Sequence, residues 1–510
     1  MKRRYQTLGI TCMSLGTALL ACVNPSLVDE TDWLEAQTPY FTIWSSMEAG
    51  RTRELADDLL HFRTFFADAA KNVRTDPVIP TYIYAFASPR MAAAFLDSEE
   101  HASAFHSSMR DNRIVLYEMD SARETLELQR YQYARSLLRN DGSPYPLWYE
   151  RGLAQLLGTA EILGDQAQIG RPSKSLRRQI RYATSWGRWV SVKRLLERSD
   201  YARNPPDIYL LHAEYWLLVH YLHLGRGERG PAERDVAEFL RLWSEGKPAI
   251  EALEQALGTT ARELDDTLRA YAKRAEFHEV TIERSAVARP DPPDVRPFEA
   301  SAMAEALGWL SLKDERFARA TRFFEEASSL DTGNAHARAG VAVVLDHRGR
   351  FARAASLWSD AIPLAPDSAL NQLEYARHWD DRASGAGDPS KREQLLAQAR
   401  EHYLRSRSLD ATRPETHALY GATYLNEGEN TWQGFDSIVR AHEMLGSNPE
   451  FNLFLACAYA RVDRPEEARS HAWIVREWLR YWRKRDLDRL LRQYPSGCQQ
   501  YWQELLYEDR

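Results

Sequence analysis

The chain has 510 residues, of which 44% are hydrophobic, and its formal net charge is -7. This length can bury more than one hydrophobic core, so we expect a soluble protein of several domains. The small negative net charge is not that of a protein whose main partner is nucleic acid, and we predict no nucleic-acid binding.

The first residues have the pattern of an export signal. A basic start is followed by a mostly apolar run from Leu8 to Ala21, which is too short to cross a bilayer as a helix. The run ends in Leu19-Leu20-Ala21-Cys22, which resembles the bacterial lipobox. That resemblance implies removal of residues 1–21 and lipidation of Cys22. An ordinary secretory signal that happens to contain a cysteine is the alternative.

This signal predicts an exported cell-envelope lipoprotein that is anchored to a membrane and faces the periplasm. No later stretch is long and apolar enough to span a bilayer. Two cysteines remain beyond the signal and Cys22, namely Cys457 and Cys498. An oxidising compartment would allow them to pair. We expect them to stay unpaired, because they are distant in sequence and Cys457 falls inside a predicted helix.

Residues 31–120 alternate between strand and helix patterns. Aromatic and β-branched residues predict strands at Tyr40–Trp44, Thr81–Ala87 and Arg113–Tyr117. Apolar residues at helical spacing predict a helix over Leu55–Ala69 between the first two strands.

From Ser121 onward the patterns are mostly helical. We predict helices from Ser121 to Arg139, from near Trp148, over Tyr209–Leu224 and over Val236–Trp243, with a hairpin at Gly164-Asp165. Thr260 and Glu263 have the spacing of a capping box that opens a further helix. The proline-rich segment 286–298 then predicts a semi-rigid linker.

A 34-residue repeat follows the linker. Gly308, Ala320, Phe324 and Ala327 are matched by Ala342, Ala354, Trp358 and Ala361. Less regular copies follow, about five in all, and a Trp-rich helix from Ala472 to Trp482 is predicted to cap the end. The period and the small-large-small pattern resemble the tetratricopeptide (TPR) family, whose paired helices stack into a superhelix.

The TPR resemblance implies a groove that binds a protein or peptide partner. Carried onto the two best copies, the groove residues are Glu305, Trp309, Lys313, Ala339, Val343 and His347. Trp309 could be an exposed binding residue, since tryptophans often dominate binding energy at interfaces. It could equally be a core packing residue.

Several short segments in residues 32–275 carry a second resemblance. They are Trp33-Leu34-Glu35, Pro39–Thr42, Tyr82–Ala87, Leu137–Asn140, Pro146–Tyr149, Gly152–Ala154 and Trp216–Leu222. They resemble the peptidase-MA-like proteins, a bacterial gluzincin-type group often fused to TPRs.

In that family, HExxH places two zinc-binding histidines on one helix face, and the glutamate between them activates water. Here the aligned residues are Tyr131-Gln132-Tyr133-Ala134-Arg135. The position of the third ligand is Arg151, and the neighbouring Glu150 is expected to point elsewhere on its helix. Guanidinium groups cannot donate electron pairs to a metal ion. We therefore predict no catalytic residue, no metal and no cofactor in this domain.

Other sites receive less support from the sequence. His220 and His223, and His101 and His106, lack a carboxylate at a convincing spacing and are interpreted as packing residues. Basic residues dominate between Arg171 and Arg198, with Trp186 and Trp189 among them. This segment could meet anionic lipid or cell-wall polymer, although a solvated surface is the simpler interpretation.

The predicted fold is α+β and mostly helical: a small mixed sheet with helices, gluzincin-like, followed by an all-α TPR superhelix. The predicted boundaries are 1–21 signal peptide, 32–275 degenerate peptidase-like domain, 286–298 linker, 299–475 repeats and 476–510 capping helix and tail. The function we favour is a non-enzymatic scaffold of the cell envelope. An active zinc-type or other hydrolase with an unrecognised site, and a glycan or lipid-headgroup binder, remain alternatives.

Overall fold

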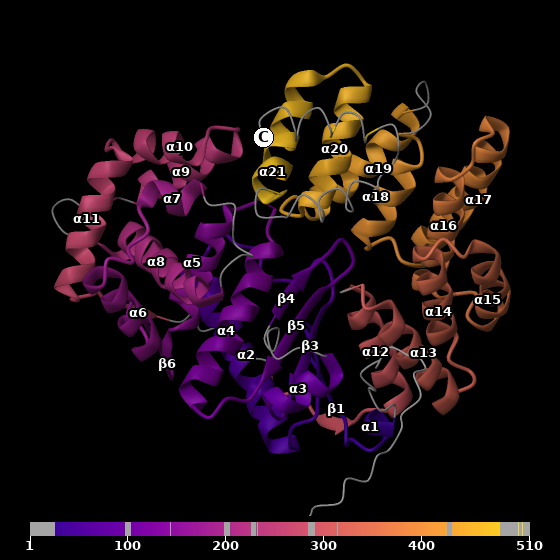
Figure 1. The fold of residues 1–510 in the computed structure, drawn as a ribbon, viewed down its shortest axis with the longest axis horizontal. Coiled ribbons are helices and arrows are strands. Elements are labelled where there is room, and N and C mark those ends of the chain that lie inside the picture. The colour runs from indigo at the N-terminus through magenta and orange to yellow at the C-terminus, as the bar shows by residue number, and fades with distance from the viewer. Residues whose placement is uncertain are drawn as a thin grey trace, which may run out of the picture.

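A computed structural model describes residues 26–96, 104–142, 144–197, 205–225, 231, 233–283, 291–313, 315–425, 431–479, 498 and 502. The chain forms an N-terminal half, drawn from indigo to magenta in Figure 1, and an arc of helices drawn from red through orange to yellow. The two halves pack against each other. The fold is mostly helical with a small mixed sheet, as predicted.

The sheet of the N-terminal half has six strands among the described residues, in the order β4-β5-β3-β2-β1-β9. The predicted strands form its centre, where β2 pairs in parallel with β3, and β3 with β5. β1, β4 and β9 add to it antiparallel. The bounds are β1 Leu34–Gln37, β2 Thr42–Ser45, β3 Thr81–Phe86, β4 Ala104–Ser107, β5 Asn112–Tyr117 and β9 Val295–Pro297.

Helices of both halves cover this sheet. Ile83 and Ala85 of β3 are buried in one cluster with residues of α2 and α4, whereas Tyr84 and Phe86 point to the other face. Because side chains alternate along a strand, that second face needs its own cover. It is provided by Leu307 and its neighbours in α12, the first helix of the arc. The arc is therefore part of the packing of the sheet.

The remaining elements of the N-terminal half include the helices and the hairpin that the sequence predicts, together with further short helices and a strand that it did not mark. They are α1 Ser26–Asp29, α2 Ala49–Ala69, α3 Pro89–Leu96, α4 Ala122–Arg139, α5 Leu147–Gly158, α6 Lys174–Ser185, α7 Val192–Glu197, α8 Pro205–Leu224, α9 Glu233–Ser244, α10 Ala249–Leu257 and α11 Ala261–Arg274, with strands β6 Glu161–Leu163, β7 Gln166–Ile169 and β8 Val280–Glu283. The capping box of Thr260 and Glu263 is confirmed at the start of α11.

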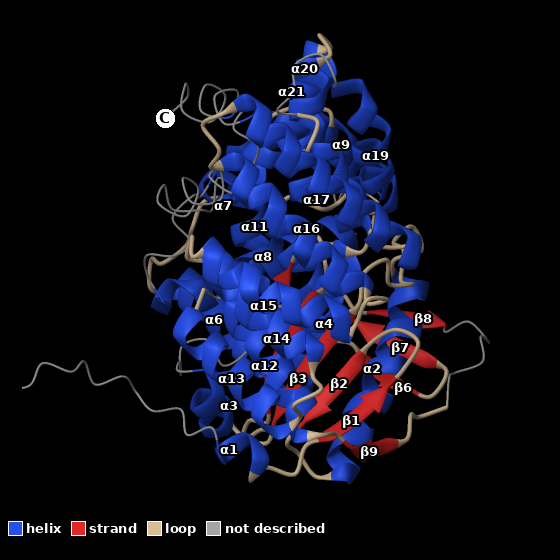
Figure 2. Cartoon of the chain, turned by 90° about the vertical axis from the view of Figure 1, so that its right-hand side faces the viewer, coloured by secondary structure: helices blue, strands red, loops and turns tan. Residues whose placement is uncertain are grey.

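The predicted linker is partly a strand. Residues 284–290 lie outside the described part, but β9 pairs with β1 in the register Glu35↔Arg296 and Leu34↔Pro297. Proline cannot donate to a strand ladder, and an edge strand tolerates it because one side needs no partner. Figure 2 shows β9 at the edge of the red sheet, next to β1. The connection between the halves is therefore tied to the first half.

The arc contains five helical hairpins among the described residues, in agreement with the predicted repeat. They are α12 Ala300–Lys313 with α13 Phe317–Leu330, α14 Ala335–His347 with α15 Phe351–Leu364, α16 Ala369–Ser384 with α17 Pro389–Leu409, α18 Pro414–Ala422 with α19 Thr431–Met444, and α20 Pro449–Arg461 with α21 Pro465–Leu479. Ala472–Leu479, the described part of the predicted Trp-rich capping helix, belongs to the second helix of the fifth hairpin.

Small residues set the spacing within the hairpins. Phe324 and Trp358, the large residues of the first two copies, are completely buried. A Cβ atom added to Gly308 would lie 2.6 Å from the Phe324 ring, and one on Gly340 would also overlap that ring. Glycine at these positions lets the aromatic ring fill the space between neighbouring helices, as the repeat pattern predicts.

The arc contacts the N-terminal half at both of its ends. At its start, the Tyr84 hydroxyl donates to the carbonyl of Ala306 at 3.1 Å. At its far end, the Trp473 Nε1–H donates to the carbonyl of Trp243 at 3.0 Å, and the Ser447 hydroxyl donates to the carbonyl of Arg139 at 2.6 Å. The concave side of the arc therefore faces the N-terminal half.

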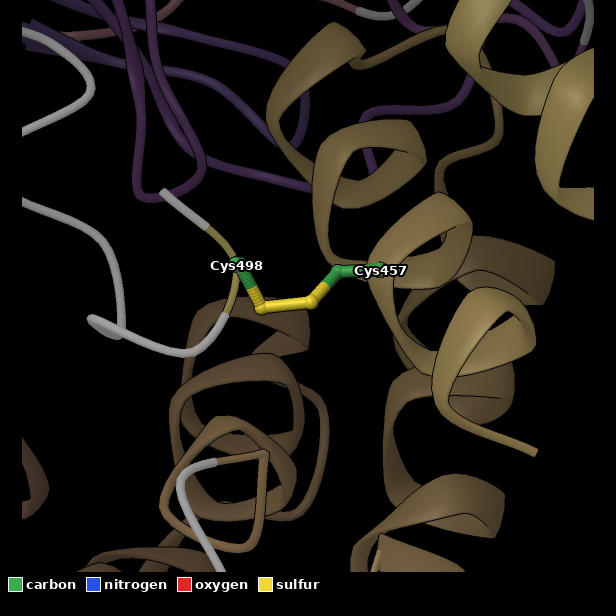
Figure 3. The surroundings of a disulfide bond; sticks show 2 residues. All are labelled: Cys457 and Cys498. Atoms are coloured by element: carbon green, nitrogen blue, oxygen red, sulfur yellow. A yellow bond between two sulfur atoms is a disulfide. The ribbon is translucent and has the colours of Figure 1, made fainter. Parts of the chain in front are cut away.

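Cys457 and Cys498 form a disulfide, contrary to the expectation of free thiols (Figure 3). Their Cα atoms are 5.7 Å apart, although 41 positions separate them in sequence. The prediction failed because Cys457 lies on α20 with its side chain on a buried face, and Cys498, also buried, packs into the same cluster. Distance along the chain did not indicate distance in space.

The predicted signal peptide and Cys22 lie outside the described residues. Within the described part of the chain, none of the helices is long and apolar enough to cross a bilayer.

Candidate functional site

The four degenerate positions of the peptidase resemblance come together between α4 and α5. Tyr131, Gln132 and Arg135 lie on α4, and Arg151 lies on α5. The guanidinium carbon of Arg135 lies 5.8 Å from the ring centroid of Tyr131 and 4.9 Å from that of Phe105. The positions that the sequence aligned with the motif therefore lie close together in the structure.

A carboxylate joins the two helices in this cluster. Arg135 Nε lies 3.2 Å from one oxygen of Glu150, and Arg139 Nε lies 2.6 Å from the other. The side chain of Glu150 is only 2% exposed. The expectation that Glu150 points away is thus wrong: it faces α4, because a buried carboxylate needs cationic partners.

His212 of α8 completes the cluster and was not singled out from the sequence. Its Nε2 lies 3.4 Å from Arg151 Nη1, and its ring lies 6.0 Å from that of Tyr131. His212 lies eight residues before His220 on the same apolar helix and matches no metal-ligand spacing, so sequence reasoning had no means to find it.

The electrostatics of the cluster are those of crowded cations around one anion. Burial lowers the pKa of His212 to about 3, and Arg151 and Arg135 act in the same direction, so this histidine is neutral. Burial alone would raise the pKa of Glu150, but Arg139, Arg135 and Arg151 hold it below its usual value. Burial lowers the pKa of Arg139, and the positive charges of Arg135 and Arg151 lower this pKa further.

These residues do not fit a zinc ion. Arg135 and Arg151 have only N–H donors and no lone pair to offer. Gln132 occupies the position of the general base, and an amide cannot accept a proton at neutral pH. Within the described residues, no three His, Cys, Asp or Glu side chains converge to hold a metal ion.

The histidine pair on α8 has satisfied partners. His220 places Nε2 at 3.0 Å from the carbonyl of Gly170, and Tyr271 places its hydroxyl at 2.9 Å from Nδ1. His223 Nε2 lies 2.9 Å from the hydroxyl of Tyr149. These contacts agree with the packing interpretation. Of the other pair, His101 lies outside the described residues and His106 lies on β4.

A cavity of about 580 Å³ separates the α4–α5 cluster from the concave side of the arc. Four of the six predicted groove residues line it, namely Trp309, Lys313, Val343 and His347. Arg135 and Arg151 line it from the N-terminal half. Glu305 and Ala339 do not, and Ala339 is completely buried in the core of the repeats. Part of the predicted groove and the α4–α5 cluster therefore form two walls of one cavity.

Trp309 is mainly a packing residue. Only 8% of its surface is exposed, and its ring packs edge-on against Phe324 with centroids 5.1 Å apart. Its Nε1–H donates to Glu305 at 3.3 Å, and its carbonyl accepts a hydrogen bond from Arg113. Of the two alternatives for Trp309, these contacts support core packing.

The turn between β4 and β5 reaches into the concave side of the arc. Arg110 of this turn bonds to Glu415 at 3.0 and 3.1 Å and also to Glu374. Its guanidinium carbon lies 5.6 Å from the centroid of Trp309. The side chains of Glu374 and Glu415 are 3% and 4% exposed. Part of the groove is thus filled by the chain's own turn, which no sequence pattern had marked.

The basic segment carries an exposed aromatic pair. Trp186 and Tyr182 are 75% and 42% exposed, with ring centroids 6.3 Å apart in a stacked arrangement. Trp189, by contrast, donates its Nε1–H to Asp265 at 2.9 Å, and Arg171 pairs with Glu279. The segment is therefore part solvated ion pairs and part open surface.

Comparison with known proteins finds similarity only in structure. No protein-family model and no curated protein matches the sequence. Among solved structures, a thermophilic TPR protein of Thermus thermophilus is similar at 19% identity, over 38% of this chain and 96% of that chain, with a TM-score of 0.32. The pilF protein of Pseudomonas aeruginosa has 15% identity over 41% and 93%, with a TM-score of 0.30.

A third similar structure is YrrB, described as a TPR protein with an unusual peptide-binding site. It has 15% identity over 34% of this chain and 82% of that chain, with a TM-score of 0.25. Scores of this size do not define a shared fold. The assignment of a TPR-like repeat therefore rests on the 34-residue period and the five hairpins of this chain.

Proposed function

We propose that this chain is a non-enzymatic interaction protein of the cell envelope, which holds a peptide segment of a partner protein between its two halves. The observation that carries the proposal is the shared cavity. Its volume of about 580 Å³ lies within the range of ligand sites, about 300–1,000 Å³, and its walls come from α4, α5 and the first helices of the repeats.

The chemistry of the walls supports binding over hydrolysis. The positions that would hold a metal ion and activate water carry phenol, amide and guanidinium groups, and Glu150 is already engaged by Arg135 and Arg139. The proposal therefore includes the loss of the peptidase activity that the family resemblance would imply. Incubation of the purified chain with denatured casein tests this: no cleavage is expected, and cleavage that depends on Glu150 would overturn it.

Export and lipid anchoring are part of the same proposal. They are supported by the basic start, the apolar run and the Leu19–Cys22 sequence. The Cys457–Cys498 disulfide is compatible with an oxidising compartment. Membrane partition of the full chain, compared with a Cys22→Ser variant, tests the anchor. The variant is expected to leave the membrane fraction, and equal partition would contradict lipidation.

Photo-crosslinking in cells tests the cavity directly. Lys313 and His347 are exposed and line the cavity, whereas Leu364, 49% exposed, lies outside it. Each would be replaced in turn by p-benzoylphenylalanine. We expect one common crosslinked partner from Lys313 and His347 and none from Leu364. The same products from all three positions, or none from the cavity, would refute the proposal.

The exposed Trp186–Tyr182 pair favours a second candidate function, contact with anionic lipid headgroups. Exposed aromatic rings next to arginines are typical of protein surfaces that lie at a membrane interface. Flotation of the unlipidated chain with phosphatidylglycerol vesicles tests this idea. Trp186→Ala is expected to weaken flotation, and an unchanged fraction would exclude this surface.

A further inference from the structure

Charge is distributed unevenly over the walls of the cavity. Among the described residues that line it, seven are basic and four are acidic: Arg110, Arg113, Arg135, Arg139, Arg151, Lys313 and Arg377 against Glu315, Glu374, Glu415 and Glu450. The positions of these charges, more than their number, indicate what the cavity can hold.

On the arc side the charges are matched. Arg110 and Arg377 share the carboxylates of Glu374 and Glu415, with Arg377 Nη1 3.3 Å from Glu415. Arg113 is paired with Asp111 at 2.7 Å. These ion pairs fix the β4–β5 turn on the arc and leave little net charge there.

On the α4–α5 side three guanidinium groups surround the carboxylate of Glu150. Arg135, Arg139 and Arg151 all line the cavity, whereas Glu150 lies behind the wall at 2% exposure. Arg135 and Arg139 retain 13% and 17% exposure of their own side chains, so both can reach a ligand. Burial is the main cause of the lowered pKa of His212, and the charges of Arg151 and Arg135 lower this pKa further.

Guanidinium groups in such an arrangement favour one class of ligand. Their planar N–H donors match the two oxygens of a carboxylate, and such charge-assisted hydrogen bonds are stronger than neutral ones. An incoming carboxylate would also offset the repulsion that Arg135 and Arg151 exert on the charge of Arg139.

We propose that the Arg135–Arg139–Arg151 wall binds a carboxylate of the partner segment, at the place where the metallopeptidases that this domain resembles hold their metal ion. This inference rests on the proposed peptide-binding function and specifies its ligand. The carboxylate can be the free C-terminus of the partner or an Asp or Glu side chain.

The test uses the full mature chain and three pools of fluorescein-labelled random octapeptides. One pool has a free C-terminus and no Asp or Glu, the second is amidated but contains Asp and Glu, and the third is amidated with neither. Equilibrium dialysis at low salt measures the fraction of each pool bound. We expect the first or the second pool to bind about tenfold more tightly than the third, the effect of one charge-assisted hydrogen bond.

Variants assign the effect to this wall. Arg151→Gln is expected to lower binding of the preferred pool about tenfold towards that of the neutral pool. Arg178→Gln, on the exposed surface of α6, is the matched control and is expected to change nothing. Thermal unfolding checks that each variant is folded. The comparison of the three pools uses the unmodified chain alone, so it tests the carboxylate preference even if a variant does not fold.

The outcomes separate the two proposals. Equal binding of all three pools, blocked by Val343→Trp in the cavity, would overturn the carboxylate inference while the proposed function stands. No binding of any pool, together with no crosslink from Lys313, would overturn both. A preference for carboxylate that survives Arg151→Gln and Arg135→Gln would place the anion elsewhere and refute this inference.

Discussion

Arg110 joins the N-terminal half to the arc, and Arg110→Met tests how strongly the two halves are coupled. The substitution keeps most of the side-chain volume but removes the cation between Glu374 and Glu415, whose side chains are 3% and 4% exposed. Breaking a buried ion pair by removal of one partner costs about 3–5 kcal/mol. Arg377 remains close to both carboxylates, at 4.0 and 3.3 Å, so we expect the lower end, about 3 kcal/mol.

Calorimetric unfolding of the full chain measures this effect. Arg405→Met is the matched control, because Arg405 and its partner Asp367 are 51% and 75% exposed and such surface pairs contribute at most about 1 kcal/mol. Equal shifts of the melting temperature for the two variants would refute the view that the turn fastens the arc.

The pH dependence of the same comparison gives an independent check. Burial acts to raise the pKa of Glu374, but Arg110 and Arg377 hold it below its ordinary value. A depressed pKa stabilises the folded chain above the unfolded pKa, and this contribution is lost as the pH falls through the folded pKa. The difference in stability between the unmodified chain and Arg110→Met should therefore be full at neutral pH and shrink on acidification below the usual range of glutamate. A difference that grows with acid would contradict this.

Three further changes test the packing and the charges. In urea unfolding, Gly308→Val should destabilise the arc by about 2–3 kcal/mol because the new side chain overlaps with Phe324. Gly387→Val should change the unfolding little, because a Cβ atom there meets nothing within 4 Å, and equal effects of the two variants would argue against the close helix approach. The disulfide closes a loop of 41 positions, so the Cys457→Ala/Cys498→Ala variant should lose about 4 kcal/mol of unfolding free energy, and its melting temperature should no longer respond to dithiothreitol. An unmodified chain whose melting temperature does not respond to dithiothreitol would contradict the disulfide. Glu150→Gln should lower the free energy of urea unfolding by about 3–5 kcal/mol, because it leaves Arg135 and Arg139 without their carboxylate, whereas the exposed Glu279→Gln should lower it far less. No loss of stability in Glu150→Gln would show that the cluster is not buried as described.

Elements with a strong local signal were predictable from the sequence. The central strands are rich in aromatic and β-branched residues, and the repeat is recognised from the regular spacing of Gly308, Phe324 and their counterparts. Strand β9 was missed because its residues include Pro297 in a proline-rich stretch, and only its pairing with β1 makes it a strand.

The site could be predicted only in pieces. The resemblance to peptidases marked Arg135 and Arg151, and the repeat marked Lys313 and His347, but no sequence pattern places these two sets across one cavity. The contact depends on Arg110 in a short turn and on the burial of one sheet face by α12. Both are long-range features, which local periodicity cannot report.

Zinc content after dialysis tests the central proposal most directly, namely that the α4–α5 cluster is a cationic wall for a partner and not a metal-dependent catalytic centre. The full chain would be equilibrated with micromolar zinc, dialysed against metal-free buffer and analysed by mass spectrometry of the metal. We predict below about 0.1 zinc per chain, because guanidinium and amide groups cannot replace zinc ligands. About one zinc per chain that is lost in a Tyr131→Phe/Glu150→Gln variant would contradict the account.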